Sequence, residues 1–284
     1  MGLVRTLIDH DGESAESPLP RKLSELYDGD LHFRPLPAAR PFVIANFVST
    51  LDGVASYKIE GKSGGSTISG SDPGDKFIMG LLRASADAVM VGAGTLHDAS
   101  TESLWTPEYT YPDARRLYAE YRVDALHKSE YPLLVIVSGS GRLELDRAIF
   151  RTPAMRTVVI TTSAGRDELT RRGAATLNCT EVRALDSSSG GIPPRAILEL
   201  LQSQFGVKTL LHEGGPTLFG QFLAADVVDE LFLTLSPQIA GRRPDVSRPA
   251  VVQGVQFVPD SAPRFQVVSV KERVAYLYLR YRRT

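Results

Sequence analysis

Cysteine is nearly absent from this sequence, with Cys179 the single cysteine among 284 residues. One thiol cannot form an internal disulfide, and zinc or iron–sulfur sites that need several cysteine ligands are excluded. The five histidines are scattered along the chain, so we expect no bound metal. A chain without disulfides is typical of a reducing compartment, and we therefore expect a cytoplasmic protein.

Long hydrophobic runs and an excess of charge of one sign are missing as well. The longest apolar runs, such as residues 133–137, have the length of a strand, far below the roughly 20 residues that span a bilayer. The first residues contain no apolar stretch of signal-peptide length. Lysine and arginine number 32 against 33 acidic residues, a balance that disfavours polyanions. We expect neither a membrane nor a nucleic acid as partner.

The first 40 residues differ in texture from the rest of the chain. They contain acidic, serine-rich and proline-rich stretches with little periodicity, and we predict an N-terminal extension over residues 1–40. From Pro41 onward, short apolar runs alternate with segments of helical period, which is typical of βα units. Residues 41–284 are therefore predicted to form one domain.

Five segments rich in β-branched residues are predicted strands. They are residues 42–48, 86–91, 133–137, 157–162 and 208–213. Predicted helices lie over residues 113–127, 166–173, 193–205 and 216–225. A further helix is expected to start with Asp72 as its N-cap and Pro73 as its first residue, with Arg83 at its far end.

The C-terminal part changes to a period of two. Residues 264–270 and 273–282 alternate in this way, with a tight turn predicted at Lys271–Glu272, as in an antiparallel hairpin. The predicted fold is α/β, with a mostly parallel central sheet flanked by helices and an antiparallel C-terminal hairpin.

The strongest local motif is LLHEGGPTLFGQFL, residues 210–223. A strand ends at His212-Glu213, two glycines allow a close approach of the backbone, and Pro216 presets a helical turn. Three N–H groups, those of Thr217, Leu218 and Phe219, are predicted to be free at this helix N-terminus, which favours a phosphate. An ordinary strand-to-helix junction is the alternative.

Three further segments follow predicted strands. One is Gly-Ala-Gly-Thr, residues 92–95; another is Asp52 in an Asp-Gly turn, either a plain turn residue or a carboxylate facing a ligand. The third is residues 136–142, whose Ser138, Ser140 and Arg142 suit a ribose 2′-phosphate or a solvated turn. Loops at the carboxyl ends of strands in one sheet meet in one crevice, so we expect the four segments to converge there.

Taken in order, these motifs resemble one family. The run S-T-L-D-G (49–53), T-I-S-G (67–70), L-L-R-A-S-A-D-A-V-M-V-G-A-G-T (81–95), E-G-G-P-T-L (213–218) and V-D-E-L (228–231) is similar to the C-terminal reductase domain of the bifunctional riboflavin-biosynthesis deaminase/reductase. The likeness is greatest to stand-alone actinobacterial members. It implies a dihydrofolate-reductase-like fold, NADPH as cofactor and a homodimer.

The resemblance also implies site residues and a reaction. The cofactor contacts it implies, together with Ser138 from the turn above, are Ser49, Thr67, Thr95, Asp98, Gly214, Gly215, Pro216, Thr217, Leu218, Phe219 and Gly220. Arg83 and Glu213 match substrate-binding positions, and Asp52 and Glu213 are the candidate catalytic carboxylates. The implied reaction reduces the ribose of 5-amino-6-(5-phosphoribosylamino)uracil, a small-molecule substrate, by hydride transfer from NADPH.

Two departures from the family pattern leave alternatives open. With one cysteine, the chain lacks the His-x-Glu and Pro-Cys-x-x-Cys zinc site of the deaminase half. The loop after Thr95 lacks the family's phosphate-binding arginine motif, and Arg115 and Arg116 are the nearest basic residues. Two alternatives are a reductase of the same fold that acts on a dihydrofolate or pterin ring, and a non-catalytic NADP(H)-binding protein.

Overall fold

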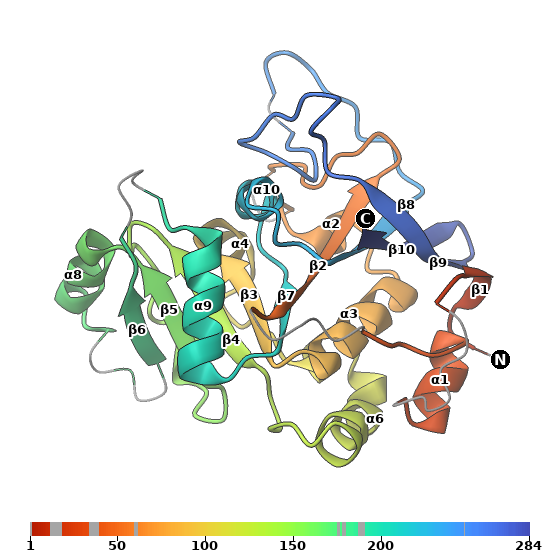
Figure 1. The fold of residues 1–284 in the computed structure, drawn as a ribbon, viewed down its shortest axis with the longest axis horizontal. Helices are drawn as coiled ribbons and strands as arrows, with labels where there is room; N and C mark the ends of the chain where they lie inside the picture. The colour runs from red at the N-terminus through yellow and green to blue at the C-terminus, as the bar shows by residue number, and fades with distance from the viewer. Residues whose placement is uncertain are drawn as a thin grey trace.

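One sheet of ten strands crosses the molecule, from β6 on the left of Figure 1 to β1 on the right. Its strand order is β1-β9-β10-β8-β2-β7-β3-β4-β5-β6 in this computed structural model. The structure describes residues 2–11, 19–33, 40–59, 62–174, 177, 180–186, 191–246 and 248–284. Cys179 lies outside these ranges.

The strands from β8 to β6 are all parallel. They are β2 (Phe42–Thr50), β3 (Ala88–Gly92), β4 (Leu133–Ser138), β5 (Thr157–Thr161), β6 (Thr180–Ala184), β7 (Thr209–His212) and β8 (Glu230–Ser236). Most are apolar runs buried along their length, as parallel strands covered by helices on both faces must be. The five predicted strands and the mostly parallel sheet are confirmed.

The antiparallel C-terminal hairpin is also confirmed, and consists of β9 (Phe265–Arg273) and β10 (Tyr276–Arg283). The predicted turn at Lys271–Glu272 is wrong. Both residues belong to β9, where Lys271 pairs with Tyr278 and Glu272 with Leu277. The chain reverses instead at Val274, whose φ is 56°. Cross-strand pairing extended β9 beyond the point where the apolar alternation stops.

Helices cover both faces of the sheet. Alternate residues of a strand point to opposite faces. Phe42 and Ile44 therefore belong to one buried cluster with residues of α3 (Pro73–Ser85), and Val43 and Ala45 belong to a second cluster with residues of α9 (Pro194–Phe205). The other longer helices are α8 (Ser163–Arg171) and α10 (Pro216–Ala224). The shorter ones are α1 (Arg21–Tyr27), α2 (Gly65–Ile68), α4 (Ala93–Asp98), α5 (Pro107–Thr110) and α7 (Ala148–Arg151).

The predicted helix over residues 113–127 is made of three helical types. A 3₁₀ turn at Pro112–Ala114 leads into α6 (Arg115–Ala119), and a π-helix follows at Glu120–Ala125. In that π-helix the buried Arg122 donates to the carbonyls of Ala84 and Ala86 at the end of α3, at 3.1 Å for Ala84. The irregular helix therefore caps α3.

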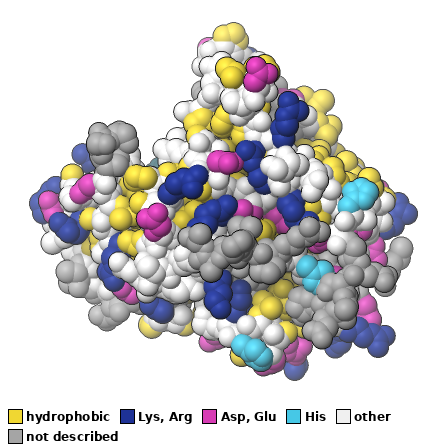
Figure 2. Space-filling view, in the orientation of Figure 1, with side chains coloured by type: hydrophobic (Ala, Val, Ile, Leu, Met, Phe, Trp, Pro, Cys, Tyr) yellow, Lys and Arg dark blue, Asp and Glu magenta, His cyan; other side chains and the backbone are white. Residues whose placement is uncertain are grey.

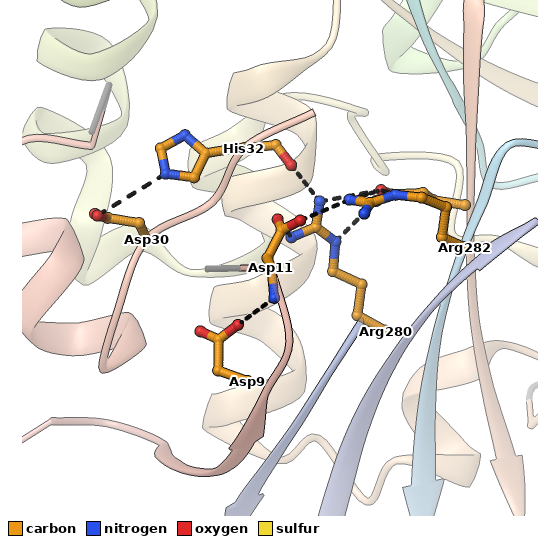
Figure 3. Close-up of polar contacts among 7 residues, drawn as sticks. Asp9, Asp11, Asp30, His32, Arg280 and Arg282 are labelled. Atoms are coloured by element: carbon orange, nitrogen blue, oxygen red, sulfur yellow. Dashed lines mark hydrogen bonds and ion pairs between the residues drawn. The ribbon is translucent and has the colours of Figure 1, made fainter. Parts of the chain in front are cut away.

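The N-terminal residues join the same sheet. Strand β1 (Arg5–Asp9) pairs with β9, and Leu23 and Tyr27 of α1 are buried in the core. Ion pairs hold this segment (Figure 3): Asp11 lies 2.8 Å from Arg280 and 2.9 Å from Arg282 of β10. The boundary predicted after residue 40 stays a prediction.

Charge of neither sign forms a large patch on the face seen in Figure 2. On the face seen in Figure 2, Lys and Arg side chains alternate with Asp and Glu, in keeping with the net charge of −1. No helix in the described part of the chain is long and apolar enough to cross a membrane.

Candidate active site

Loops at the carboxyl ends of β3 and β7 lie against each other. A Cβ placed on Gly215 would lie 3.3 Å from Oγ1 of Thr95, and one placed on Gly92 would lie 3.6 Å from Cδ2 of Leu218. Two motifs, at Thr95 and at Gly215, are 120 residues apart in the sequence and meet at one edge of the sheet. This is where open α/β sheets bind ligands.

Arg83 of α3 and Glu213, just after β7, form a bidentate ion pair at this edge. Arg83 Nε lies 3.0 Å from Oε1 of Glu213, and Nη2 lies 2.7 Å from Oε2. The side chains are 6% and 9% exposed. Nη1 donates to the carbonyls of Leu104 and Thr106, at 3.3 and 3.2 Å. Arg83 is therefore buried and joins Glu213 to the loop at Leu104 and Thr106, and it is not a solvated cation at a helix end.

Asp52 braces two loops. Its carboxylate accepts hydrogen bonds from Oγ1 of Thr50 at 2.5 Å and from the N–H groups of Ala240 and Gly241 at 3.1 and 2.8 Å. The bond from Thr50, followed by that from Ala240, lowers the pKa of Asp52 to about 2. These contacts tie the turn after β2 to the loop after β8, and they match the plain turn residue that the sequence left as an alternative.

Asp75 in the first turn of α3 is a buried carboxyl that the sequence did not single out. Burial, with added repulsion from Asp72 and Glu213, raises the pKa of Asp75 to about 6, although the neighbouring hydroxyls of Thr234 and Ser69 offset part of the rise. The fold thus shifts the pKa values of these two carboxyls in opposite directions, with Asp52 ionised and Asp75 able to hold a proton near neutral pH.

The N-terminus of α10 follows Gly214-Gly215 as predicted. The N-cap Gly215 makes no side-chain cap, so the N–H groups of Thr217 and Leu218 keep no helical partner. The expectation of a third free donor is wrong, because the N–H of Phe219 donates to the carbonyl of Gly215 at 3.1 Å and starts the helical ladder. Two free donors and the helix dipole suit a phosphate group.

A family model described as the RibD C-terminal domain matches residues 41–274. The chain belongs to this family. It is 30% identical over 219 residues to the 2,5-diamino-6-ribosylamino-4(3H)-pyrimidinone 5′-phosphate reductase of Archaeoglobus fulgidus, covering 77% of this chain and 89% of that one. The enzyme of the same name from Methanothermobacter thermautotrophicus is 30% identical over 205 residues, or 72% and 81% of the two chains.

Solved structures of the family share the fold. The RibD protein of Acinetobacter baumannii aligns with a TM-score of 0.64 at 22% identity, covering 87% of this chain and 59% of that one. A pyrimidine reductase-like protein of Corynebacterium diphtheriae aligns with a TM-score of 0.65 at 21% identity, covering 88% and 95%. The chain thus spans little more than half of the first protein and nearly all of the second.

Family membership settles the class of activity. The predicted oxidoreductase of riboflavin-biosynthesis type, with a dihydrofolate-reductase-like fold, is confirmed. A reduced nicotinamide cofactor follows from this class.

The other residues predicted to contact the cofactor lie in or after strands of the same sheet. Ser49 is buried at the end of β2, and Thr67 lies in α2. Asp98 in α4 pairs with Lys58, with Oδ2 and Nζ 2.9 Å apart. Ser138, at the end of β4, accepts a hydrogen bond from the N–H of Gly141 at 3.2 Å.

Helix α10 offers mainly its backbone. The side chains of Leu218 and Phe219 are buried in the core. Because the N–H of Phe219 is bound to Gly215, only the N–H of Leu218 is left for a ligand at these two positions. Gly220 follows Phe219 directly, and a Cβ there would come within 2.4 Å of the carbonyl oxygen of Gln253. Close packing of the backbone accounts for this glycine.

The sequence did not signal one candidate site residue. Asp75 stands three residues after the N-cap Asp72, whose Oδ1 accepts the N–H of Asp75 at 3.0 Å. An acidic residue at this helical position is common. Only the burial of Asp75 against β8 distinguishes it, and no spacing in the sequence signals that burial.

Proposed function

We propose that this protein is an NADPH-dependent reductase that converts the ribosyl chain of a phosphorylated 6-ribosylaminopyrimidine into a ribityl chain. The observation that supports it most is the meeting of the Arg83–Glu213 pair with the free N–H groups of α10 at one edge of the sheet. The relatives named above as pyrimidinone 5′-phosphate reductases support the same substrate class.

The residues present suit a dinucleotide. The N–H groups of Thr217 and Leu218 would hold its pyrophosphate, and Gly215 leaves room beside Thr95 for it to approach. Ser140 and Arg142 are exposed at the end of β4, where they would meet the 2′-phosphate that distinguishes NADPH from NADH. When bound, the cofactor supplies a hydride to C1′ of the open-chain imine of the substrate.

The chain's own residues orient the substrate and supply a proton. Glu213, held by Arg83, would accept hydrogen bonds from the substrate and fix its orientation. Asp75 would hold the proton that the reaction consumes, because its carboxyl is partly protonated near neutral pH. Asp52, with its oxygens bound to Thr50 and to backbone N–H groups, would hold the neighbouring loops.

The deciding experiment measures NADPH oxidation with three substrates side by side. These are 2,5-diamino-6-ribosylamino-4(3H)-pyrimidinone 5′-phosphate, 5-amino-6-(5-phosphoribosylamino)uracil and dihydrofolate. We expect turnover of at least one pyrimidine, with a catalytic efficiency at least about tenfold above that for dihydrofolate, which equals about 1.4 kcal/mol. Turnover of dihydrofolate alone, or binding of NADPH without any turnover, would contradict the proposal.

Cofactor choice and assembly have tests of their own. NADPH should bind more tightly than NADH, and Arg142→Met should reduce the ratio of the two dissociation constants. Both constants are measured by the fluorescence of the bound nicotinamide. The exposed Arg166 offers a matched control for loss of one surface charge. We also propose a homodimer in the cytoplasm, and light scattering of the purified protein tests the dimer.

A further inference from the structure

His212 is the last residue of β7 and is fully buried. Because side chains alternate along a strand, its imidazole points to the face opposite Glu213 and packs among aromatic rings. The ring centroids of Phe219 and Phe222 lie 5.6 and 5.0 Å from that of His212. An apolar side chain would fill such a position at lower cost, so a polar ring here calls for an explanation.

The Nδ1 atom of the imidazole makes a directed contact with the turn that follows. Its Nδ1 accepts a hydrogen bond from the backbone N–H of Gly214 at 3.2 Å. The preceding N–H, that of Glu213, donates to the carbonyl of Met90 in β3 at 2.9 Å. Two successive N–H groups are thus fixed by different partners, one in the sheet and one in the side chain of His212, and this sets the orientation of the peptide between them.

The turn that follows is closely packed at Gly214. A Cβ on Gly214 would lie 2.9 Å from Cε1 of His212 and 2.8 Å from Cδ2 of Leu218. Neither Gly214 nor Gly215 has a positive φ, so these glycines serve close packing rather than an unusual backbone conformation. The imidazole, the turn and the first residues of α10 therefore form one packed unit.

We propose that His212 is a positioning residue of the reductase site. Its Nδ1 holds the peptide between Glu213 and Gly214 in the orientation that directs the Glu213 carboxylate to Arg83 and the free N–H groups of α10 to the cofactor. The proposal rests on the reductase function proposed above. In this proposal a single acceptor atom, Nδ1 of His212, orients both the Glu213 carboxylate that faces the substrate and the N–H groups of α10 that face the cofactor.

Asparagine and leucine at position 212 form a matched pair. They have nearly the same shape and leave the same space when the ring is lost, but Oδ1 of asparagine stands where Nδ1 stands in histidine. We expect His212→Asn to keep NADPH affinity and kcat/KM within about threefold of the natural protein. His212→Leu should lose about tenfold or more in both, because the N–H of Gly214 is left buried without an acceptor.

Thermal unfolding controls for the packing that both variants lose. Both variants should unfold at a lower temperature than the natural protein, since both lose the ring. Equal cofactor affinity and equal kcat/KM in the two variants would overturn the proposal. Cofactor binding is measured without substrate. Absence of turnover in the natural protein would therefore contradict the proposed function, while the NADPH affinities of the two variants could still be compared.

A second measurement needs no variant. If Nδ1 accepts the N–H of Gly214, the ring proton of the neutral imidazole is on Nε2. Nitrogen NMR of the natural protein with labelled histidine should find this tautomer at pH 7. A proton on Nδ1 would exclude the acceptor role and overturn the proposal even if neither variant folds.

Discussion

Arg83 and Glu213 face each other through two parallel N–H···O bonds, although 130 residues separate them in the chain. The pair joins helix α3 to the end of strand β7, and the remaining nitrogen of Arg83 holds the loop at Leu104 and Thr106. A single guanidinium thus connects the carboxylate proposed to orient the substrate with the loop that departs from the family pattern.

Breaking this pair should affect both stability and activity. Glu213→Gln leaves the buried guanidinium without its counter-ion, and we expect the free energy of unfolding to fall by about 3 kcal/mol. Arg83→Lys keeps the charge and removes the fork, so catalytic efficiency should fall at least about tenfold. The double variant Arg83→Met/Glu213→Leu, followed by thermal unfolding and kinetics, is the control. If it restores stability and also activity, the pair has no part in catalysis.

Gly215→Val should weaken NADPH binding without unfolding the protein. A Cβ at this position comes within 3.3 Å of Oγ1 of Thr95, a tight contact with the end of one side chain, and valine would occupy the approach to α10. We expect the NADPH dissociation constant, measured by titration calorimetry, to rise about tenfold or more. Gly214→Ala should in addition lower thermal stability, since its Cβ would strike Leu218 and the ring of His212. An unchanged dissociation constant in folded Gly215→Val would place the cofactor elsewhere.

Asp75→Asn should abolish a pH dependence of both rate and stability. The pKa of Asp75 is raised from 3.8 to about 6 in the folded protein. Its contribution to stability is therefore complete below pH 3.8 and is lost as the pH rises through about 6, by about 3 kcal/mol at 1.36 kcal/mol per unit. The variant, which cannot ionise, should lack that loss.

Kinetics distinguish a catalytic Asp75 from a merely buried one. If the protonated carboxyl supplies the proton, kcat/KM should decline above about pH 6, and Asp75→Asn should be at least about tenfold slower without that decline. Profiles of the same shape and height for the two proteins would remove Asp75 from the mechanism.

Asp11→Asn should weaken the attachment of the N-terminal segment to β10, because the ion pairs with Arg280 and Arg282 are lost. Burial by itself would raise the pKa of Asp11, but Arg280 and Arg282 outweigh it and keep the pKa below 3.8. The stabilisation is thus present above pH 3.8 and is lost as the pH falls through the lower folded value. Chemical denaturation should find the variant less stable near pH 7 by about 2 kcal/mol, with a smaller difference near pH 3. A constant difference across this range would contradict the assignment.

Periodicity and residue type determined much of the fold. The apolar, β-branched segments beginning near Phe42 and Leu133 predicted parallel strands, because a strand covered on both faces must be apolar along its length. The Asp72-Pro73 start of α3 and the Gly215-Pro216 start of α10 were predictable from local capping chemistry. The ordered motifs, taken together, also gave the family.

Tertiary structure alone decided which of these residues act together. The position of the turn at Val274 depended on the pairing of β9 with β10. The joining of β1 to the sheet depended on its pairing with β9 near the far end of the chain, beside the ion pair of Asp11 with Arg280. The protonation of Asp75 and the acceptor role of His212 arise from burial and from contacts within the fold. Desolvation and hydrogen-bond geometry depend on neighbours brought in by folding, and the order of residues along a chain does not contain them locally.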